Sequence, residues 1–76
     1  MPKRASLSYR QVVQLLRKHG FSMDRQEGSH QQWIGTVRGQ PHIVTVIVEA
    51  KDYAPKTMKS MIRQSGLGEN EWYGNE

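Results

Sequence analysis

The spacing of apolar residues changes twice along this chain, and these changes constrain the fold more than any other feature. Apolar residues recur every three or four positions over residues 9–16, alternate with polar ones through much of the middle, and return to the wider spacing over 58–62. The wide spacing is typical of amphipathic helices, and the alternation is typical of β-strands. The sequence therefore predicts a helix, then strands, then a second helix.

Local signals place the ends of the two helices. Ser8 and Gln11 stand three residues apart in the form of a capping box, so the first helix should begin after Ser8. Gly20 should end it, because glycine readily adopts the left-handed conformation found after helices. Pro55 suits the first turn of the second helix, and Gly66 should end that one. Leu67 should then fold back as the apolar contact after the cap.

Three strands are predicted between the helices, over residues 21–26, 30–37 and 42–48. In the first, Phe21, Met23 and Arg25 share one face, and Phe21 and Met23 are expected to face the core. In the second, Gln31 and Trp33 lie on the face opposite His30, and Trp33 is expected in the core. Short turns at 28–29 and 38–41 make the strands antiparallel neighbours.

These elements define an α+β chain with the order α-β-β-β-α. Its three-stranded antiparallel sheet should carry both helices on one face. Residues 1–68 are expected to form a single domain, and residues 69–76 an acidic C-terminal tail that is either flexible or docked. The third strand is apolar on both faces, so a partner protein, a second copy, or Trp72 and Tyr73 of the tail could cover the open face of the sheet.

Composition narrows the function classes. A chain of 76 residues with 36% hydrophobic residues suits one small core. It has no cysteine, which removes disulfides, thiolate nucleophiles and the usual zinc-finger ligands, and its three histidines lack paired spacing. We therefore expect no metal and no cofactor. No apolar run is long enough to span a membrane and no signal region follows the N-terminus, so a cytoplasmic location is expected.

The charge is unevenly distributed. Residues 1–67 hold all 11 lysines and arginines but only four of the seven acidic residues. A body this basic attracts polyanions, and nucleic acid is the default candidate. The same charges could equally serve only to solvate a small surface. Lys56, Lys59 and Arg63 on the second helix have the same two interpretations: a solvated face, or phosphate clamps if they lie near a reactive group.

One histidine has an unusual context, the segment Glu27-Gly28-Ser29-His30. Gly28 permits an uncommon backbone angle, Ser29 is small and polar, and His30 falls at the start of a strand near Arg25. An imidazole there could accept a proton near neutral pH, or it could be an ordinary turn residue. By contrast, His19 at a helix end and His42 at a strand start are expected to be structural.

Several segments, taken in order, resemble the HicA family of toxins over roughly residues 8–67. They are Tyr9-Arg10-Gln11-Val12-Val13 with Leu16, then His19-Gly20-Phe21, then Arg25-Gln26-Glu27-Gly28-Ser29-His30, and finally the helix from Lys56 to Leu67 ending in Ser-Gly-Leu. The chain departs from the family where members commonly carry Val-Pro-x-His, because it reads Val46-Ile47-Val48-Glu49. Its loop at 50–55 also lacks the usual glycine.

The resemblance implies a double-stranded-RNA-binding-like fold and an mRNA-cleaving activity without a metal. It also implies a HicB-type antitoxin that masks the site, with a homo-oligomer possible inside that complex. The histidine of Gly-Ser-His is catalytic in the family, which carries over to His30. Around it we expect an RNA-binding set of Gly28, Ser29, Arg25, Lys56, Lys59 and Arg63. A noncatalytic RNA-binding or protein-interaction module of the same fold is the alternative.

Overall fold

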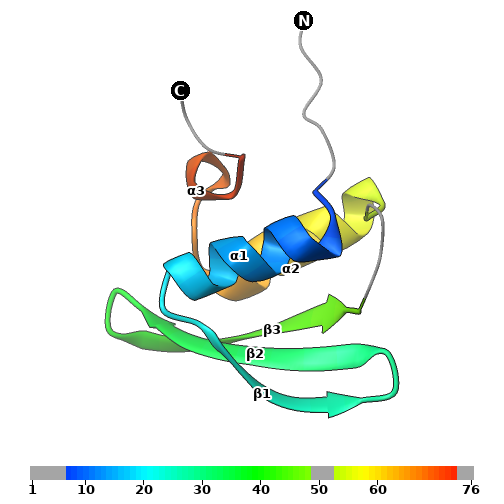
Figure 1. Cartoon of the computed structure of the whole chain (residues 1–76). Helices are drawn as coiled ribbons and strands as arrows, with labels where there is room; N and C mark the ends of the chain where they lie inside the picture. The colour runs from blue at the N-terminus through cyan, green and yellow to red at the C-terminus, as the bar shows by residue number, and fades with distance from the viewer. Residues whose placement is uncertain (1–6, 49–52, 74–76) are drawn as a thin grey trace, which may run out of the picture.

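A computed structural model describes residues 7–48 and 53–73 and contains one helix, three strands and two further helices in chain order (Figure 1). The elements are α1 Tyr9–Lys18, β1 Ser22–Glu27, β2 His30–Val37, β3 Gln40–Ile47, α2 Pro55–Ser65 and α3 Glu69–Tyr73. The sequence predicted all of them except α3. Half of the predicted loop at 50–55, namely residues 50–52, lies outside the described residues.

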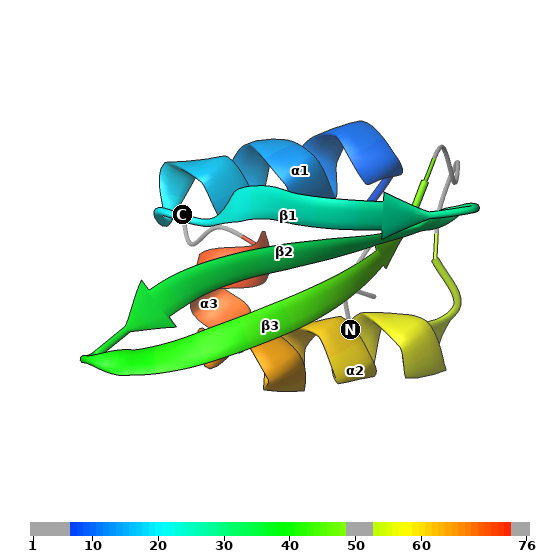
Figure 2. The same cartoon turned by 90° about the horizontal axis from the view of Figure 1, so that it is seen from below.

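The three strands form one antiparallel sheet in the order β1-β2-β3, so β2 is the central strand. Helices α1 and α2 lie together on one face of this sheet, and the opposite face is open (Figures 1 and 2). The predicted α+β layout is therefore confirmed. Strand β3 begins two residues earlier than predicted and includes Pro41. As β3 is an edge strand, the missing N–H of Pro41 is tolerated there.

The predicted helix ends are also confirmed. The Ser8 hydroxyl accepts a hydrogen bond from the Gln11 N–H at 3.3 Å, and the Ser8 N–H donates to the Gln11 Oε1 at 2.9 Å. This is the reciprocal capping box expected from the sequence. At the other ends, Gly20 and Gly66 have φ angles of +89° and +75°. Glycine adopts this left-handed conformation without the steric cost that other residues have.

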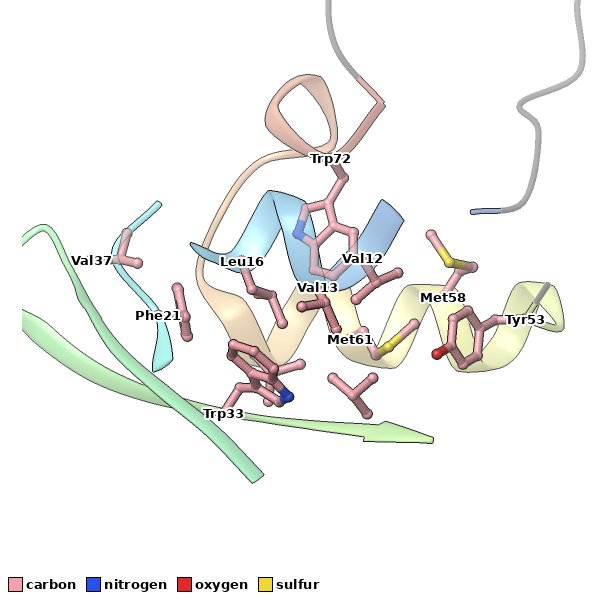
Figure 3. Packing of buried hydrophobic residues seen from close by; sticks show 12 residues of the cluster. Val12, Val13, Leu16, Phe21, Trp33, Val37, Tyr53, Met58, Met61 and Trp72 are labelled. Carbon is pink, nitrogen blue, oxygen red and sulfur yellow. The ribbon is translucent and has the colours of Figure 1, made fainter. Parts of the chain in front are cut away.

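The hydrophobic core lies between the sheet and the helices (Figure 3). Helix α1 contributes Val12, Val13 and Leu16, and the inner face of β2 contributes Trp33. Met58 and Met61 of α2, which lie in the segment with helical apolar spacing, are buried as well. The remaining buried apolar residues are Phe21, Val37, Val44, Val46, Tyr53 and Trp72. Leu67 packs against this cluster after the end of α2, as the cap predicted.

Met23 lies on the predicted face of β1 but is not buried in the core. Met23 pairs with the buried Trp33, yet its side chain is 45% exposed. The reason is its place at the edge of the sheet, where all six residues of β1 are exposed. A two-residue period identifies which residues share a face of a strand, but burial also requires a helix above that strand.

The C-terminal segment is docked as far as Tyr73. Trp72 of α3 is buried, and its indole Nε1 donates to the Ser65 hydroxyl at 2.9 Å. That hydroxyl also accepts from the Leu67 N–H at 3.0 Å and donates to the Ile62 carbonyl at 2.8 Å, so its hydrogen bonds are satisfied. Trp72 thus packs among the helices (Figure 3) and does not cover the open sheet face. The division of the chain at residue 68 stays a prediction.

Gly35 allows a close approach between β2 and the residue that leads into β1. A Cβ atom at position 35 would lie 2.6 Å from the Cγ of Phe21, well inside van der Waals contact. Phe21 is buried, so its ring has little room to move away. A glycine in the middle of a central strand is therefore explained by the aromatic ring that lies over it.

We expect Gly35→Ala to lower the free energy of unfolding by about 1 to 3 kcal/mol, because the new methyl group overpacks a closed contact. Urea denaturation measures this change. Thr36→Ala, at the exposed neighbouring position, is the control and should stay within about 0.5 kcal/mol of the wild type. Unchanged or higher stability for Gly35→Ala would contradict the packing described here.

Candidate active site

A two-residue turn presents His30. Glu27 ends β1, His30 begins β2, and the two are paired across the hairpin. Gly28 and Ser29 connect them, and Gly28 has φ of +60° at the first turn position. A positive φ at that position alone is typical of a type II′ turn, which matches the twist of the strands it joins. The imidazole therefore extends from a backbone that is fixed on both sides by the hairpin.

The alternation of β2 directs His30 away from the helices. Gln31 and Trp33 are buried beneath the helix layer, whereas His30 and Ile34 are exposed. Because successive side chains of a strand point to opposite faces, His30 must lie on the open face of the sheet. This is the arrangement the sequence predicted for β2.

His30 borders a surface depression of about 220 Å³ on this open face. Residues of all three strands line it: Asp24, Arg25, Glu27, His30, Gln32, Ile34 and Ile43. A guanidinium, an imidazole and two carboxylates thus surround a partly aliphatic surface. The predicted association of Arg25 with His30 is present in the structure, but the two carboxylates beside them were not part of the predicted site.

A β-bulge brings Arg25 to this face. Met23 pairs with Trp33, but the next paired residue, Arg25, is opposite Gln32, so Asp24 is an extra residue in β1. The extra residue resets the alternation, and Arg25 leaves the face that Met23 occupies. The prediction that Met23 and Arg25 share one face is therefore wrong. Bulges are frequent beside functional sites, where they redirect a side chain.

The basic residues of α2 lie elsewhere. Lys56, Lys59 and Arg63 are exposed, on the helix that packs against the other face of the sheet (Figure 2). None of them lines the depression at His30. The structure therefore groups Arg25, Gly28 and Ser29 with His30 and leaves the three α2 cations in the other layer. Their contact with RNA stays a prediction.

The other two histidines have structural surroundings. The Nδ1 of His42 lies 2.9 Å from the Gln64 carbonyl oxygen, to which it donates, and the ring lies directly against Gly66. His42 thus packs against the end of α2. His19 is the C-terminal cap residue of α1. Within residues 7–48 and 53–73, no cluster of three or more potential metal ligands is found.

Tyr53 lies on the helix side of the sheet, at the same end of the sheet as His30. Its hydroxyl donates to the carbonyl of Ile47 at 2.6 Å, and Ile47 is the residue of β3 paired with His30. Burial, together with the nearby Tyr9, raises the pKa of Tyr53 to about 12. The neutral phenol is therefore the form that the folded protein favours.

This shift predicts a loss of stability at alkaline pH. The pKa of Tyr53 is about 12 in the folded protein against 10.0 for the free side chain, so the unfolded chain loses this proton first. The stabilising contribution is complete below about pH 10 and declines as the pH rises toward about 12. Urea unfolding should be measured across this range for the wild type and for Tyr53→Phe. The difference between their free energies of unfolding should become smaller as the pH rises. A difference independent of pH would contradict the shift.

The fold and site together define a small α+β domain with an exposed histidine at a hairpin on its open sheet face. The model of the HicA toxin family of bacterial toxin-antitoxin systems matches residues 9–67, which include the whole sheet and His30. The chain belongs to this family. No curated protein matches it. Within the described residues, no helix is long and apolar enough to cross a membrane.

Proposed function

We propose that the protein is a HicA-type toxin acting as a metal-independent endoribonuclease that cleaves mRNA in the cytoplasm and thereby blocks translation. The observation that carries this proposal is the exposed imidazole of His30, presented by the Gly28-Ser29 turn beside Arg25 in a chain of the HicA family. An imidazole can both accept and donate a proton, which is what the reaction requires of this residue.

In the proposed reaction, neutral His30 removes the proton from a ribose 2′-hydroxyl as the general base. The 2′ oxygen attacks the adjacent phosphorus, and the bond from phosphorus to the 5′ oxygen of the next nucleotide breaks. The products are a 2′,3′-cyclic phosphate and a 5′-hydroxyl. The leaving 5′ oxygen takes its proton from the imidazolium formed in the first step, from a lysine, or from water.

Arg25 is the proposed phosphate ligand next to His30, because it is the one arginine or lysine among the described residues that line the depression. A guanidinium can form two parallel hydrogen bonds with phosphate oxygens and stabilise the charge that develops on them. The carboxylates of Asp24 and Glu27 would repel a phosphate in the depression, so binding there depends on the attraction of the Arg25 guanidinium. Lys56, Lys59 and Arg63 would hold RNA phosphates outside the depression.

A HicB-type antitoxin is the proposed partner, and the open sheet face is its proposed contact surface. Ile34, Ile43 and Ile47 are 40%, 57% and 38% exposed on this face. Ile34 and Ile43 line the depression with His30, and Ile47 pairs with His30 across the sheet. A protein that buried these three side chains would exclude RNA from the imidazole at the same time. A homo-oligomer within that complex is compatible with this surface.

We expect His30→Ala to lose RNA cleavage by at least about a hundredfold, because a positioned general base contributes about a hundred- to ten-thousand-fold. Labelled RNA incubated with nuclease-free protein measures cleavage, and a mobility shift measures binding. The variant should still fold and bind RNA, because His30 is exposed. His19→Ala is the matched control, since it removes an imidazole at the end of α1, and it should cleave normally.

Two results would overturn the proposal. Full cleavage by His30→Ala would remove the assigned base. The second result is that the wild-type protein shifts the mobility of the RNA but leaves it intact. The protein would then be a noncatalytic RNA-binding module, which is the alternative that the sequence also allows.

A further inference from the structure

Gln31 is a buried polar side chain directly behind the proposed catalytic residue. It follows His30 in β2, points to the opposite face, and is only 6% exposed. A buried amide destabilises a protein unless its hydrogen bonds are satisfied. The Gln31 Oε1 accepts from the Tyr9 hydroxyl at 3.0 Å and from the Trp33 indole Nε1 at 2.9 Å. Gln31 is thus hydrogen-bonded to a residue of α1 and to a residue of the core.

The amide nitrogen of Gln31 is connected to the turn by hydrogen bonds through Gln26. The Gln31 Nε2 donates to the Oε1 of Gln26 at 2.9 Å. The Nε2 of Gln26 donates in turn to the carbonyl oxygen of Gly28 at 3.0 Å. A continuous series of hydrogen bonds therefore runs from Tyr9 through Gln31 and Gln26 to the first residue of the turn before His30.

The second turn residue is held from the other side. The carbonyl of Ser29 accepts a hydrogen bond from the Val48 N–H, just after β3, at 2.8 Å. Both carbonyl groups of the turn are thus fixed, one by the Gln26 side chain and one by the backbone. An exposed two-residue turn would otherwise move readily, and the side chain that follows it would move with it.

We propose that Gln31 and Gln26 are positioning residues, which hold the Gly28-Ser29 turn and thereby fix the direction of the His30 imidazole. This rests on the proposed function of His30, because positioning matters only if the imidazole transfers a proton. Neither glutamine reaches the open face: Gln26 pairs with Gln31, and both lie behind His30. The cause of the effect is geometric, since a displacement of about 1 Å can reduce a rate by about a hundredfold.

Gln26→Glu tests this link with little disturbance of the core, because Gln26 is exposed. Glutamate can still accept the hydrogen bond from Gln31, but an ionised carboxylate cannot donate to Gly28. We expect kcat for RNA cleavage, measured at saturating RNA, to fall by about tenfold or more. Gln40→Glu adds the same charge at the opposite end of the sheet and is the control, with kcat unchanged.

Hydrogen exchange at the Val48 amide gives a second measurement that does not depend on catalysis. This amide bonds to the turn, so a looser turn should speed its exchange about five- to tenfold in Gln26→Glu and leave it unchanged in Gln40→Glu. A change in KM alone, or unchanged exchange, would overturn the positioning role. If the wild-type protein cleaves no RNA, the proposed function fails, and Val48 exchange still decides whether the glutamines hold the turn.

Discussion

The burial of Trp33 in the middle of β2 is the constraint on which the site depends. Trp33 is one of the largest fully buried side chains, and its indole N–H must find an acceptor once water is excluded. Gln31, two residues earlier on the same face, supplies that acceptor. With Gln31 and Trp33 both required beneath the helices, the residue before them can point only to the open face. That residue is His30.

Buried polar groups elsewhere in the core also have hydrogen-bond partners. Ser65 is fully buried on α2 and accepts hydrogen bonds from the indole of Trp72 and the N–H of Leu67. Throughout the residues that the structure describes, no buried side-chain nitrogen or oxygen atom lacks a hydrogen-bond partner. A small core with satisfied polar groups can keep one arrangement, whereas an unsatisfied group would destabilise it. The rigid side of the sheet thus supports the solvent-exposed side that carries His30.

Many features of the fold could be predicted from the sequence, because they depend on residues that are close together in the chain. The capping box at Ser8, the left-handed glycines at 20 and 66, and the alternation of β2 all depend on neighbouring residues. The bulge at Asp24 could not be predicted, because it depends on how β1 pairs with β2, and it changed the face of Arg25. The docking of Trp72 depends on Ser65, which only the folded chain brings close. The position of Gln31 beside Trp33 was correct, but its role needed Tyr9 and Gln26, which lie on other elements.

In the proposed reaction, His30 activates a ribose 2′-hydroxyl for attack on phosphorus. The most direct test is to incubate the protein with an RNA whose scissile nucleotide carries a single 2′-deoxy substitution, and with the matched unmodified RNA. If the 2′ oxygen is the nucleophile, cleavage at the substituted bond stops, because the substituted RNA lacks that oxygen. The unmodified RNA is then cleaved to a 2′,3′-cyclic phosphate end. Continued cleavage at the deoxy position would contradict this mechanism, because the attacking oxygen would then come from water.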